Sequence, residues 1–281
     1  MAGYRYRLHG RQLASFKHAT VIALAIALTA GAAPHAGASD EDQWRPPALS
    51  ADGELPDARD VVRRVGEFMN SNQQLSFEAL VSYEAVQESG QKLHFDMLQS
   101  MKISKPDKFS WVTLHDNGAF DSGWFDAGTF TLLRQPANIW GQVALPADLP
   151  TAINRLVEEY ELAVPFADVL AGNPLELWLD EDVTLVEFVA EAWVEGNWTD
   201  HIAIRKPGRD IELWILKGDK PFPMRVSITF TDETLQPTYI ARFRKWSTSK
   251  KSSSVEPFSP PAGSERVDVI PVSESPMEES R

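Results

Sequence analysis

The sequence predicts an α+β protein built on one strongly curved, half-open antiparallel β-barrel of about ten or eleven strands, with helices covering its concave face. The first observation is that Val183 to Trp246 divides into five apolar segments of strand length, separated by short turns rich in Gly, Pro, Asp and Asn. This pattern is typical of an antiparallel meander. The second is that similar short segments fill Leu75 to Pro146. One open sheet of this size cannot stay flat, so we expect it to curl around helices.

The N-terminal residues 1–38 are predicted to be a signal peptide. Four basic residues precede an apolar stretch from Ala19 to Ala33, and Ala36-Gly37-Ala38 then matches a signal-peptidase site. We expect cleavage near Ala38 and Ser39, and therefore a periplasmic protein. The apolar stretch is shorter than the roughly 20 residues of a spanning helix, so no stable membrane span is expected in the mature form. The alternative is an uncleaved N-terminal anchor. The chain has no cysteine for a lipid anchor.

Charge and composition divide the rest of the chain. Residues 39–56 are acidic and rich in proline, which predicts a disordered lead, and residues 273–281 form an acidic tail of the same kind. Residues 57–272 are expected to form a single domain. The chain without residues 1–38 has 23 basic and 40 acidic side chains, a net charge of −17. Such a charge argues against nucleic acid as a partner, because the negatively charged phosphate backbone attracts positively charged proteins.

The first half of the domain predicts one helix and then strands. A helix is expected to begin at Asp57 and to end at Asn70-Ser71-Asn72, because apolar residues from Val61 to Met69 recur at helical spacing. From Leu75 the period changes to two, which predicts a hairpin around Ser89-Gly90-Gln91 with one buried side. Gln99 is the only residue that breaks its apolar face.

A helical insertion is predicted between the two groups of strands. Leu149–Glu161 carries an apolar stripe, Pro165 opens a short helix that Gly172 stops, and residues 175–182 suggest one more helical turn. After the last strand ends at Trp246, residues 267–272 are expected to add one edge strand.

Catalytic and metal-binding patterns are absent from the sequence. His94, His115 and His201 lie on three separate elements, without the local spacing of metal ligands. The sequence lacks a G-x-S-x-G motif, a phosphate-binding glycine loop and any cysteine. We therefore predict no catalytic residue, no metal and no cofactor. One enzymatic alternative remains, a hydrolase built on the carboxylates of Glu158–Glu159 and Asp180–Asp182.

Aromatic residues are the most informative feature, because the chain has nine tryptophans and most fall on predicted strands or the turns beside them. Such residues suit either an ordinary core or an apolar cavity for a lipid or acyl chain, and the sequence leaves both alternatives open. If there is a cavity, its predicted lining comes from the apolar phases of strands and helices. These residues are Phe77, Val81, Tyr83, Phe95, Met97, Met101, Trp111, Trp124, Trp140, Ile153, Leu156, Val157, Phe166, Trp193, Met224, Val226 and Ile228.

Several stretches also resemble a known family. The stretches are GQKLHF, KPDKF, FDAGTFTLL, LVEEYELAVPFADVL, IELWILKGDKPFPMRVSITF and RFRKW with FSPPAG. Their order resembles that in the predicted periplasmic proteins of domain-of-unknown-function family 2092. The resemblance spans roughly Asp57 to Val272. That family is similar in organisation to the lipoprotein carriers LolA and LolB and to the sensor domain of RseB. The resemblance implies a half-open sheet with helices in its mouth, and it carries over no catalytic residue.

Two functions follow as expectations. The first is a non-catalytic carrier that holds a lipid or a lipoprotein acyl chain between the sheet and lid helices. The second is an envelope module that recognises a protein partner through its acidic surface and a sheet edge, as in RseB.

Overall fold

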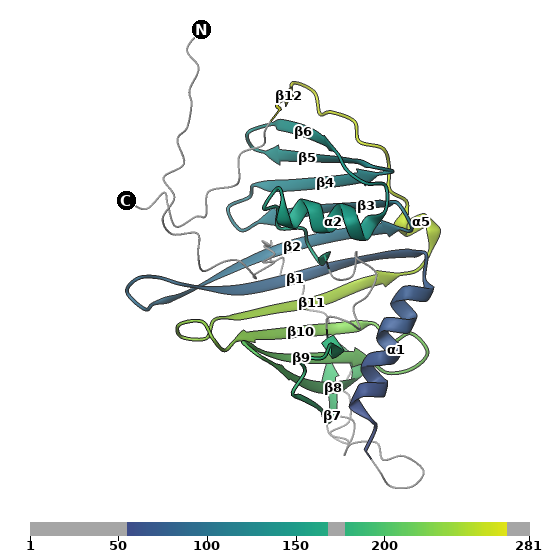
Figure 1. Cartoon of the computed structure of the whole chain (residues 1–281), viewed down its shortest axis with the longest axis vertical. Coiled ribbons are helices and arrows are strands. Elements are labelled where there is room, and N and C mark those ends of the chain that lie inside the picture. The colour runs from purple at the N-terminus through teal and green to yellow at the C-terminus, as the bar shows by residue number, and fades with distance from the viewer. Residues whose placement is uncertain (1–54, 168–177, 269–281) are drawn as a thin grey trace, which may run out of the picture.

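The structure, a computed structural model, describes residues 55–167 and 178–268 of the 281-residue chain. It is an α+β fold with one large curved, unclosed sheet and few helices (Figure 1). The first strands are β1 (Gln74–Val86), β2 (Lys92–Ser104), β3 (Lys108–His115), β4 (Phe120–Asp126), β5 (Thr129–Gln135) and β6 (Ile139–Ala144). The others are β7 (Leu185–Val194), β8 (Asn197–Lys206), β9 (Arg209–Leu216), β10 (Pro223–Phe230), β11 (Thr238–Ser247) and β12 (Glu265–Arg266).

The strands lie in the order β12-β6-β5-β4-β3-β2-β1-β11-β10-β9-β8-β7. Two meanders therefore meet at a central seam, where β1 pairs antiparallel with β11 and Ser76 lies opposite Ser247. All other neighbours are also antiparallel, except that the two-residue β12 runs parallel to β6. The eleven longer strands confirm the two groups of strands that the alternating apolar pattern predicts.

One face of the sheet carries the main hydrophobic cluster, and this face is called the inner face below. On β1 the alternate residues Phe77, Ala79 and Val81 are almost fully buried, and across the seam their neighbours Phe243 and Ala241 are buried as well. Full burial of a large apolar side chain contributes about 1.5–3 kcal/mol, so this face is the main source of stability. The opposite face is called the outer face.

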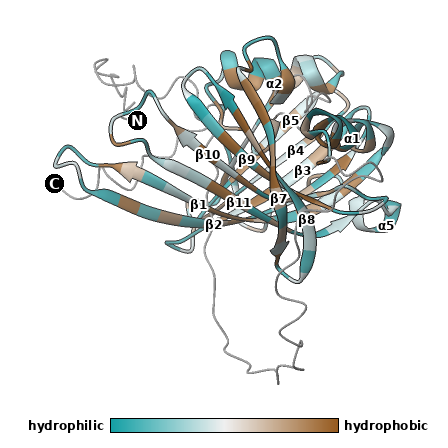
Figure 2. Cartoon of the chain, turned by 90° about the horizontal axis from the view of Figure 1, so that it is seen from below, coloured by the Kyte–Doolittle hydropathy of each residue, from teal (hydrophilic) through white to brown (hydrophobic). Residues whose placement is uncertain are grey.

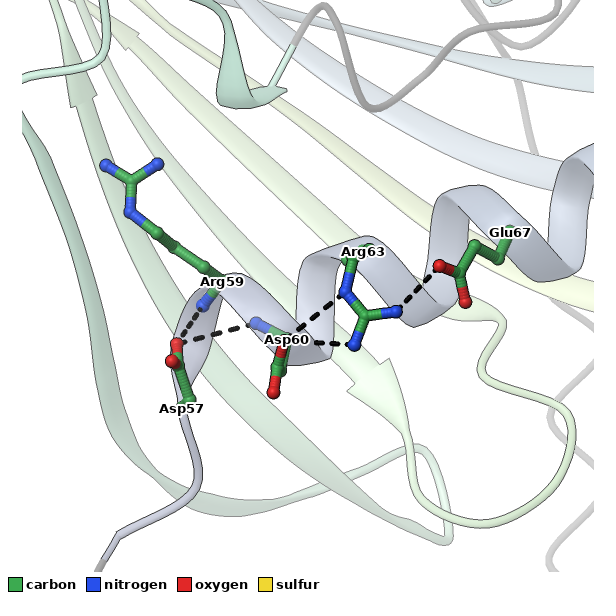
Figure 3. Close-up of polar contacts among 5 residues, drawn as sticks. All are labelled: Asp57, Arg59, Asp60, Arg63 and Glu67. Atoms are coloured by element: carbon green, nitrogen blue, oxygen red, sulfur yellow. Dashed lines mark hydrogen bonds and ion pairs between the residues drawn. The ribbon is translucent and has the colours of Figure 1, made fainter.

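Helix α1 (Ala58–Ser71) begins where the sequence predicts. The carboxylate of Asp57 caps it by accepting a hydrogen bond from the Arg59 amide at 2.8 Å (Figure 3). On its exposed side Arg63 bridges Asp60 at 3.0 Å and Glu67 at 2.6 Å (Figure 3). Its other side is apolar, and its buried residues belong to the inner-face cluster. They are Ala58, Val61, Val62, Val65 and Met69.

Helix α2 (Leu149–Glu158) is shorter than predicted. Its start agrees with the sequence, since Asp148 caps it by accepting from the Thr151 amide at 3.0 Å. It ends before Glu161 because the chain turns there: Glu161 has a left-handed φ of 50°. In Figure 1 α2 lies across β3 and β4, and Figure 2 shows α1 and α2 on the same side of the sheet.

The C-terminal segment runs along the first meander. After the short helix α5 (Lys250–Ser253), the ring of Phe258 lies 4.9 Å from that of Trp124 and 5.2 Å from that of Trp140. The chain then forms β12 beside β6. The sequence predicted this edge strand at residues 267–272, so the prediction begins two residues after the observed start of β12. The last four residues of the predicted strand lie outside the described residues.

Several sequence predictions fall on residues outside the described ranges. These are the signal peptide at 1–38, nearly all of the lead at 39–56, most of the short helix that Pro165 opens, and the tail at 273–281. Across residues 55–167 and 178–268, none of the helices combines the length and the apolar character that crossing a membrane requires.

Candidate functional site

Beneath α2 the inner face is a layer of aromatic rings. Phe109 of β3 stacks on Phe125 of β4 with ring centroids 5.6 Å apart, and Trp111 stacks on Phe130 of β5 at the same distance. All four side chains are buried and share one hydrophobic cluster with Leu149, Ala152, Ile153 and Leu156 of α2. The layer and the helix thus form one continuous apolar contact.

The ring of Trp111 fits there only because its cross-strand neighbour is Gly123. The two residues are paired in the β3–β4 register, and a Cβ atom on Gly123 would lie 2.2 Å from Cη2 of the indole. Real side chains never come this close, so the glycine gives the indole its place on the sheet. A glycine inside a strand often marks such a close approach.

The polar contacts of α2 are all local. Arg155 pairs with Glu159 one turn later at 2.6 Å, Asp148 caps the first turn, and the Leu162 amide donates to the Leu156 carbonyl. Among the described residues, every hydrogen bond and ion pair of this helix stays within residues 148–162. Its attachment to the sheet therefore consists of apolar contacts, which are not directional.

A second aromatic group spans the central seam and includes Phe166, which follows α2. The ring of Phe166 lies 5.0 Å from Phe77 on β1 and 5.2 Å from Phe243 on β11. Trp246 extends the group, at 4.4 Å from Phe77. Phe166 has a left-handed φ of 50°, which costs a residue other than glycine about 1–2 kcal/mol. Its packing on both halves of the sheet holds it in this strained conformation.

A row of polar residues crosses the inner face beside the aromatic layer, and we call it the polar row. It consists of Gln99, Thr113, Asp121 and Arg134, which are direct neighbours from β2 to β5 in the strand register. Gln99 is 1% exposed and Thr113 6% exposed. The Gln99 amide donates to the Thr113 hydroxyl at 2.9 Å, while Oε1 of Gln99 is buried without a hydrogen-bond partner.

The charges at the other end of the polar row compensate each other. Nε of Arg134 lies 3.6 Å from Oδ1 of Asp121, and Nε2 of His115 lies 3.5 Å from Oδ2 of the same carboxylate. Burial lowers the pKa of Arg134, and the charge of Asp121 opposes that shift. The arginine remains charged because its ordinary pKa is far above neutrality.

A separate charged cluster lies on the inner face near α1. Lys217 binds Glu191 and lies 3.3 Å from Asp200, while Arg64 of α1 approaches Asp200 at 3.9 Å. The side chains of Glu191 and Asp200 are 6% and 8% exposed. Burial lowers the pKa of Lys217, but its two carboxylate partners together outweigh burial and leave the pKa raised.

Comparison with protein families identifies the chain. The model of a family described as "Predicted periplasmic protein (DUF2092)" matches residues 58–270. The chain belongs to this family. The family description agrees with the periplasmic location predicted from the leader, and the match confirms the resemblance seen in the sequence.

Other comparisons of this DUF2092 protein give only remote likenesses. A search of curated proteins finds no match. An uncharacterized conserved protein from Thermus thermophilus is 14% identical with a TM-score of 0.39, covering 75% of this chain and 99% of that one. LprF from Mycobacterium bovis is 10% identical with a TM-score of 0.43, covering 74% and 97%. Lipoprotein LppX from Mycobacterium tuberculosis is 12% identical with a TM-score of 0.38, covering 67% and 94%. These likenesses are too remote to indicate a function.

In the DUF2092 protein about half of the predicted lining lies in the main hydrophobic cluster. These residues are Phe77, Val81, Met101, Trp111, Ile153, Leu156, Phe166 and Val226. Tyr83 and Ile228 pack at the margin of that cluster, and Phe95 stacks on Tyr83 at 5.5 Å. Met97 is buried in a small cluster of its own, where partly buried leucines pack against it.

Three of the remaining lining predictions, Trp124, Trp140 and Val157, need correction. Trp124 and Trp140 lie on the outer face against Phe258, because the neighbour of Trp124, Phe125, takes the inner position on β4. Val157 is 38% exposed on the free side of α2. Trp193 lies opposite Trp198 on the same face as Glu191 and Asp200, and it is 56% exposed at the end of β7.

Met224 is the last of the predicted lining residues. It is buried, but it is not part of the main cluster. An irregularity in the register between Pro223 and Arg225 takes it out of the strand alternation.

The polar row is the part of the site that pattern reading missed. Asp121 and Arg134 stand in short strands whose phase the sequence does not reveal, and Thr113 looks like an ordinary strand residue. One signal was available: Gln99 interrupts an otherwise apolar phase of β2. A polar residue at an inward position is informative because burying it without a partner is unfavourable.

The histidines and acidic clusters have separate surroundings. His94 approaches Glu84, His115 approaches Asp121, and His201 binds Glu212 at 2.8 Å. Within the described ranges, no group of three or more metal-ligating side chains occurs.

The two carboxylate clusters of the hydrolase alternative have different cationic partners. Glu159 pairs with Arg155 inside α2, whereas Asp180 pairs with Lys206 on β8. One carboxylate of each cluster is thus paired with a different cation.

Proposed function

We propose that this periplasmic DUF2092 protein is a non-catalytic carrier of an apolar ligand, such as a lipid or the acyl chain of a lipoprotein. The ligand would occupy a half-open barrel formed by the inner face, under a cover of α2 and residues 162–167. The single observation that supports this most is the purely apolar attachment of α2 to the aromatic layer, with all its polar contacts kept local.

An apolar attachment suits a cover that opens for an apolar ligand. When α2 lifts, its buried side chains and the aromatic layer lose contact with each other, and an acyl chain can replace that contact on both sides. No hydrogen bond between α2 and the sheet has to break among the described residues. Release of Phe166 from its left-handed conformation would recover part of the energy.

The described conformation would then be the closed form. Phe109, Phe125, Ile153 and Leu156 are at most 1% exposed, so a ligand needs the cover to move before it can reach them. Lid movements of this kind occur on the microsecond to millisecond timescale.

Two adjacent residues of α2 allow a matched test. Leu156 is buried in the contact and Val157 is exposed. Leu156→Ala should loosen the cover and speed uptake of a fluorescent acyl probe, whereas Val157→Ala should leave uptake unchanged. Mass spectrometry of the protein purified from the periplasm should find a co-purified lipid. Absence of both lipid and probe uptake would refute the carrier function.

A different observation favours a second function, an envelope protein-interaction module. Strand β7 is an edge of the sheet, and Val189 and Trp193 on it are 49% and 56% exposed. An edge strand can pair with an added strand of a partner. The test is a pull-down from envelope extracts with the wild type and with Val189→Lys. A partner protein that binds the wild type stoichiometrically and without lipid, and that Val189→Lys no longer binds, would favour this function over the carrier.

A further inference from the structure

Resting on the proposed carrier function, we infer that the polar row is the head-group subsite of the carrier. It would bind the uncharged, hydroxyl-bearing head of an amphipathic lipid whose chain lies on the aromatic layer. The row consists of Gln99, Thr113, Asp121 and Arg134.

The position of the polar row fits this role. One step along the strands on the same face lies an apolar row, formed by Met101, Trp111, Gly123 and Leu132 in matching register. Residues two apart in a strand are separated by roughly 6.5–7 Å, which is the length of a few methylene groups. A ligand with a polar head on the first row would therefore place the start of its chain on the indole of Trp111.

The chemistry of the row selects an uncharged head. Arg134 and Asp121 lie 3.6 Å apart and cancel each other's charge, so an anionic head would have to compete with Asp121 for the arginine. A hydroxyl group suits the other end of the row because it can both donate and accept. The buried Oε1 of Gln99 lacks a hydrogen-bond partner and would accept a hydrogen bond from such a group.

Only one end of the Gln99 amide serves the fold. Its Nε2 donates to Thr113, whereas its buried Oε1 has no partner. A leucine at this position would remove the unpaired oxygen but would also leave the Thr113 hydroxyl without its partner. If Gln99 is only structural, Gln99→Leu will change stability without changing the preference for a head group. If it serves a ligand, Gln99→Leu should abolish discrimination between head groups.

The outer face provides a matched control. Gln142 donates to Thr131 at 3.0 Å across β5 and β6, which reproduces the Gln99–Thr113 pair away from the inner face. The experiment measures displacement of a fluorescent acyl probe from the full protein by 1-monoolein, oleic acid and 1-octadecene. These competitors share an 18-carbon chain and differ in the head.

We expect the wild type and Gln142→Leu to prefer 1-monoolein over the other two by about tenfold, and Gln99→Leu to lose this preference while still binding 1-octadecene. Three outcomes would overturn the inference and leave the carrier function standing. The wild type could bind all three competitors equally, it could prefer oleic acid, or Gln99→Leu could keep the wild-type preference. If none of the three displaces the probe, the carrier function fails as well. Should Gln99→Leu not fold, Gln99→Met carries the same expectation.

Discussion

The indole of Trp111 lies over the backbone of Gly123, so that a Cβ atom on the glycine would meet Cη2 of the ring at 2.2 Å. The pair joins β3 to β4 at the centre of the aromatic layer, where Trp111 also stacks on Phe109 and Phe130. Because Gly123 has no side chain, the indole of Trp111 can lie at this position on the sheet.

Gly123→Ala is therefore expected to displace the Trp111 ring. Overpacking of this kind costs about 1–3 kcal/mol, and urea denaturation should show it as a lower unfolding midpoint. The same substitution in a Trp111→Leu background should cost much less, because the ring that collides is absent. Equal costs in the two backgrounds would show that the collision does not determine the effect.

Lys217→Met should be among the more damaging substitutions near α1. It would leave Glu191 and Asp200 buried without their common cation, and such a loss destabilises a protein by about 2–4 kcal/mol. The free energy of unfolding measures the effect at pH 7.

Lys245→Met is the control for that variant. Lys245 pairs with Glu78 at 2.8 Å, but its side chain is 69% exposed, and Arg244 also holds Glu78 at 3.0 Å. Exposed pairs contribute at most about 1 kcal/mol, so this variant should behave almost as the wild type does. If Lys217→Met and Lys245→Met lowered the free energy of unfolding by similar amounts, burial would not explain the effect.

His201 should make stability depend on pH. It is stacked on Trp214 at 4.2 Å, and burial lowers its pKa, although the bond to Glu212 opposes this shift. Because the folded protein then binds fewer protons than the unfolded chain, its contribution is complete above the ordinary pKa of 6.5 and is lost as the pH falls below it.

The pH dependence can be measured as the urea midpoint between pH 7.5 and 5.5. His201→Gln should reduce the loss of stability over this range. An identical pH profile for the wild type and His201→Gln would exclude the proposed role.

Phe258→Ala should uncover the outer-face tryptophans. Phe258 contacts both Trp124 and Trp140, and aromatic pairs contribute about 0.5–1.5 kcal/mol each beyond their area. We expect a lower melting temperature and stronger quenching of tryptophan fluorescence by iodide. Phe120→Ala, at an exposed position of the strand β4 that also carries Trp124, should change neither property. Unchanged quenching in Phe258→Ala would show that the contact does not protect the rings.

Much of this fold could be predicted because alternation is clear on long strands. Phe77, Ala79 and Val81 alternate with more polar neighbours and are buried as expected. Helix α1 was predictable for a similar reason, since its apolar residues recur at helical spacing and Asp57 is a good cap. Such patterns follow directly from strand and helix geometry.

The site was less predictable because irregularities and neighbouring aromatics hide the strand phase. In β4 both Trp124 and Phe125 are aromatic, and only the packing shows that Phe125 faces inward. In β7 the register shifts between Phe188 and Ala190, which composition does not reveal. Trp214 has apolar neighbours on both sides, and its outward direction follows from His201, on which it stacks.

The central seam has a consequence for the order in which the protein can fold. Strand β1 pairs with β2, its immediate neighbour in the chain, and also with β11, the last long strand. The β1–β2 hairpin can form early, but the β1–β11 ladder requires closure of a loop that contains most of the domain. During synthesis or export from the N-terminus, the edge of β1 therefore stays unpaired until Ser247 has arrived. Until then this edge can pair with other chains, so a chaperone that protects it would have its greatest effect at this stage.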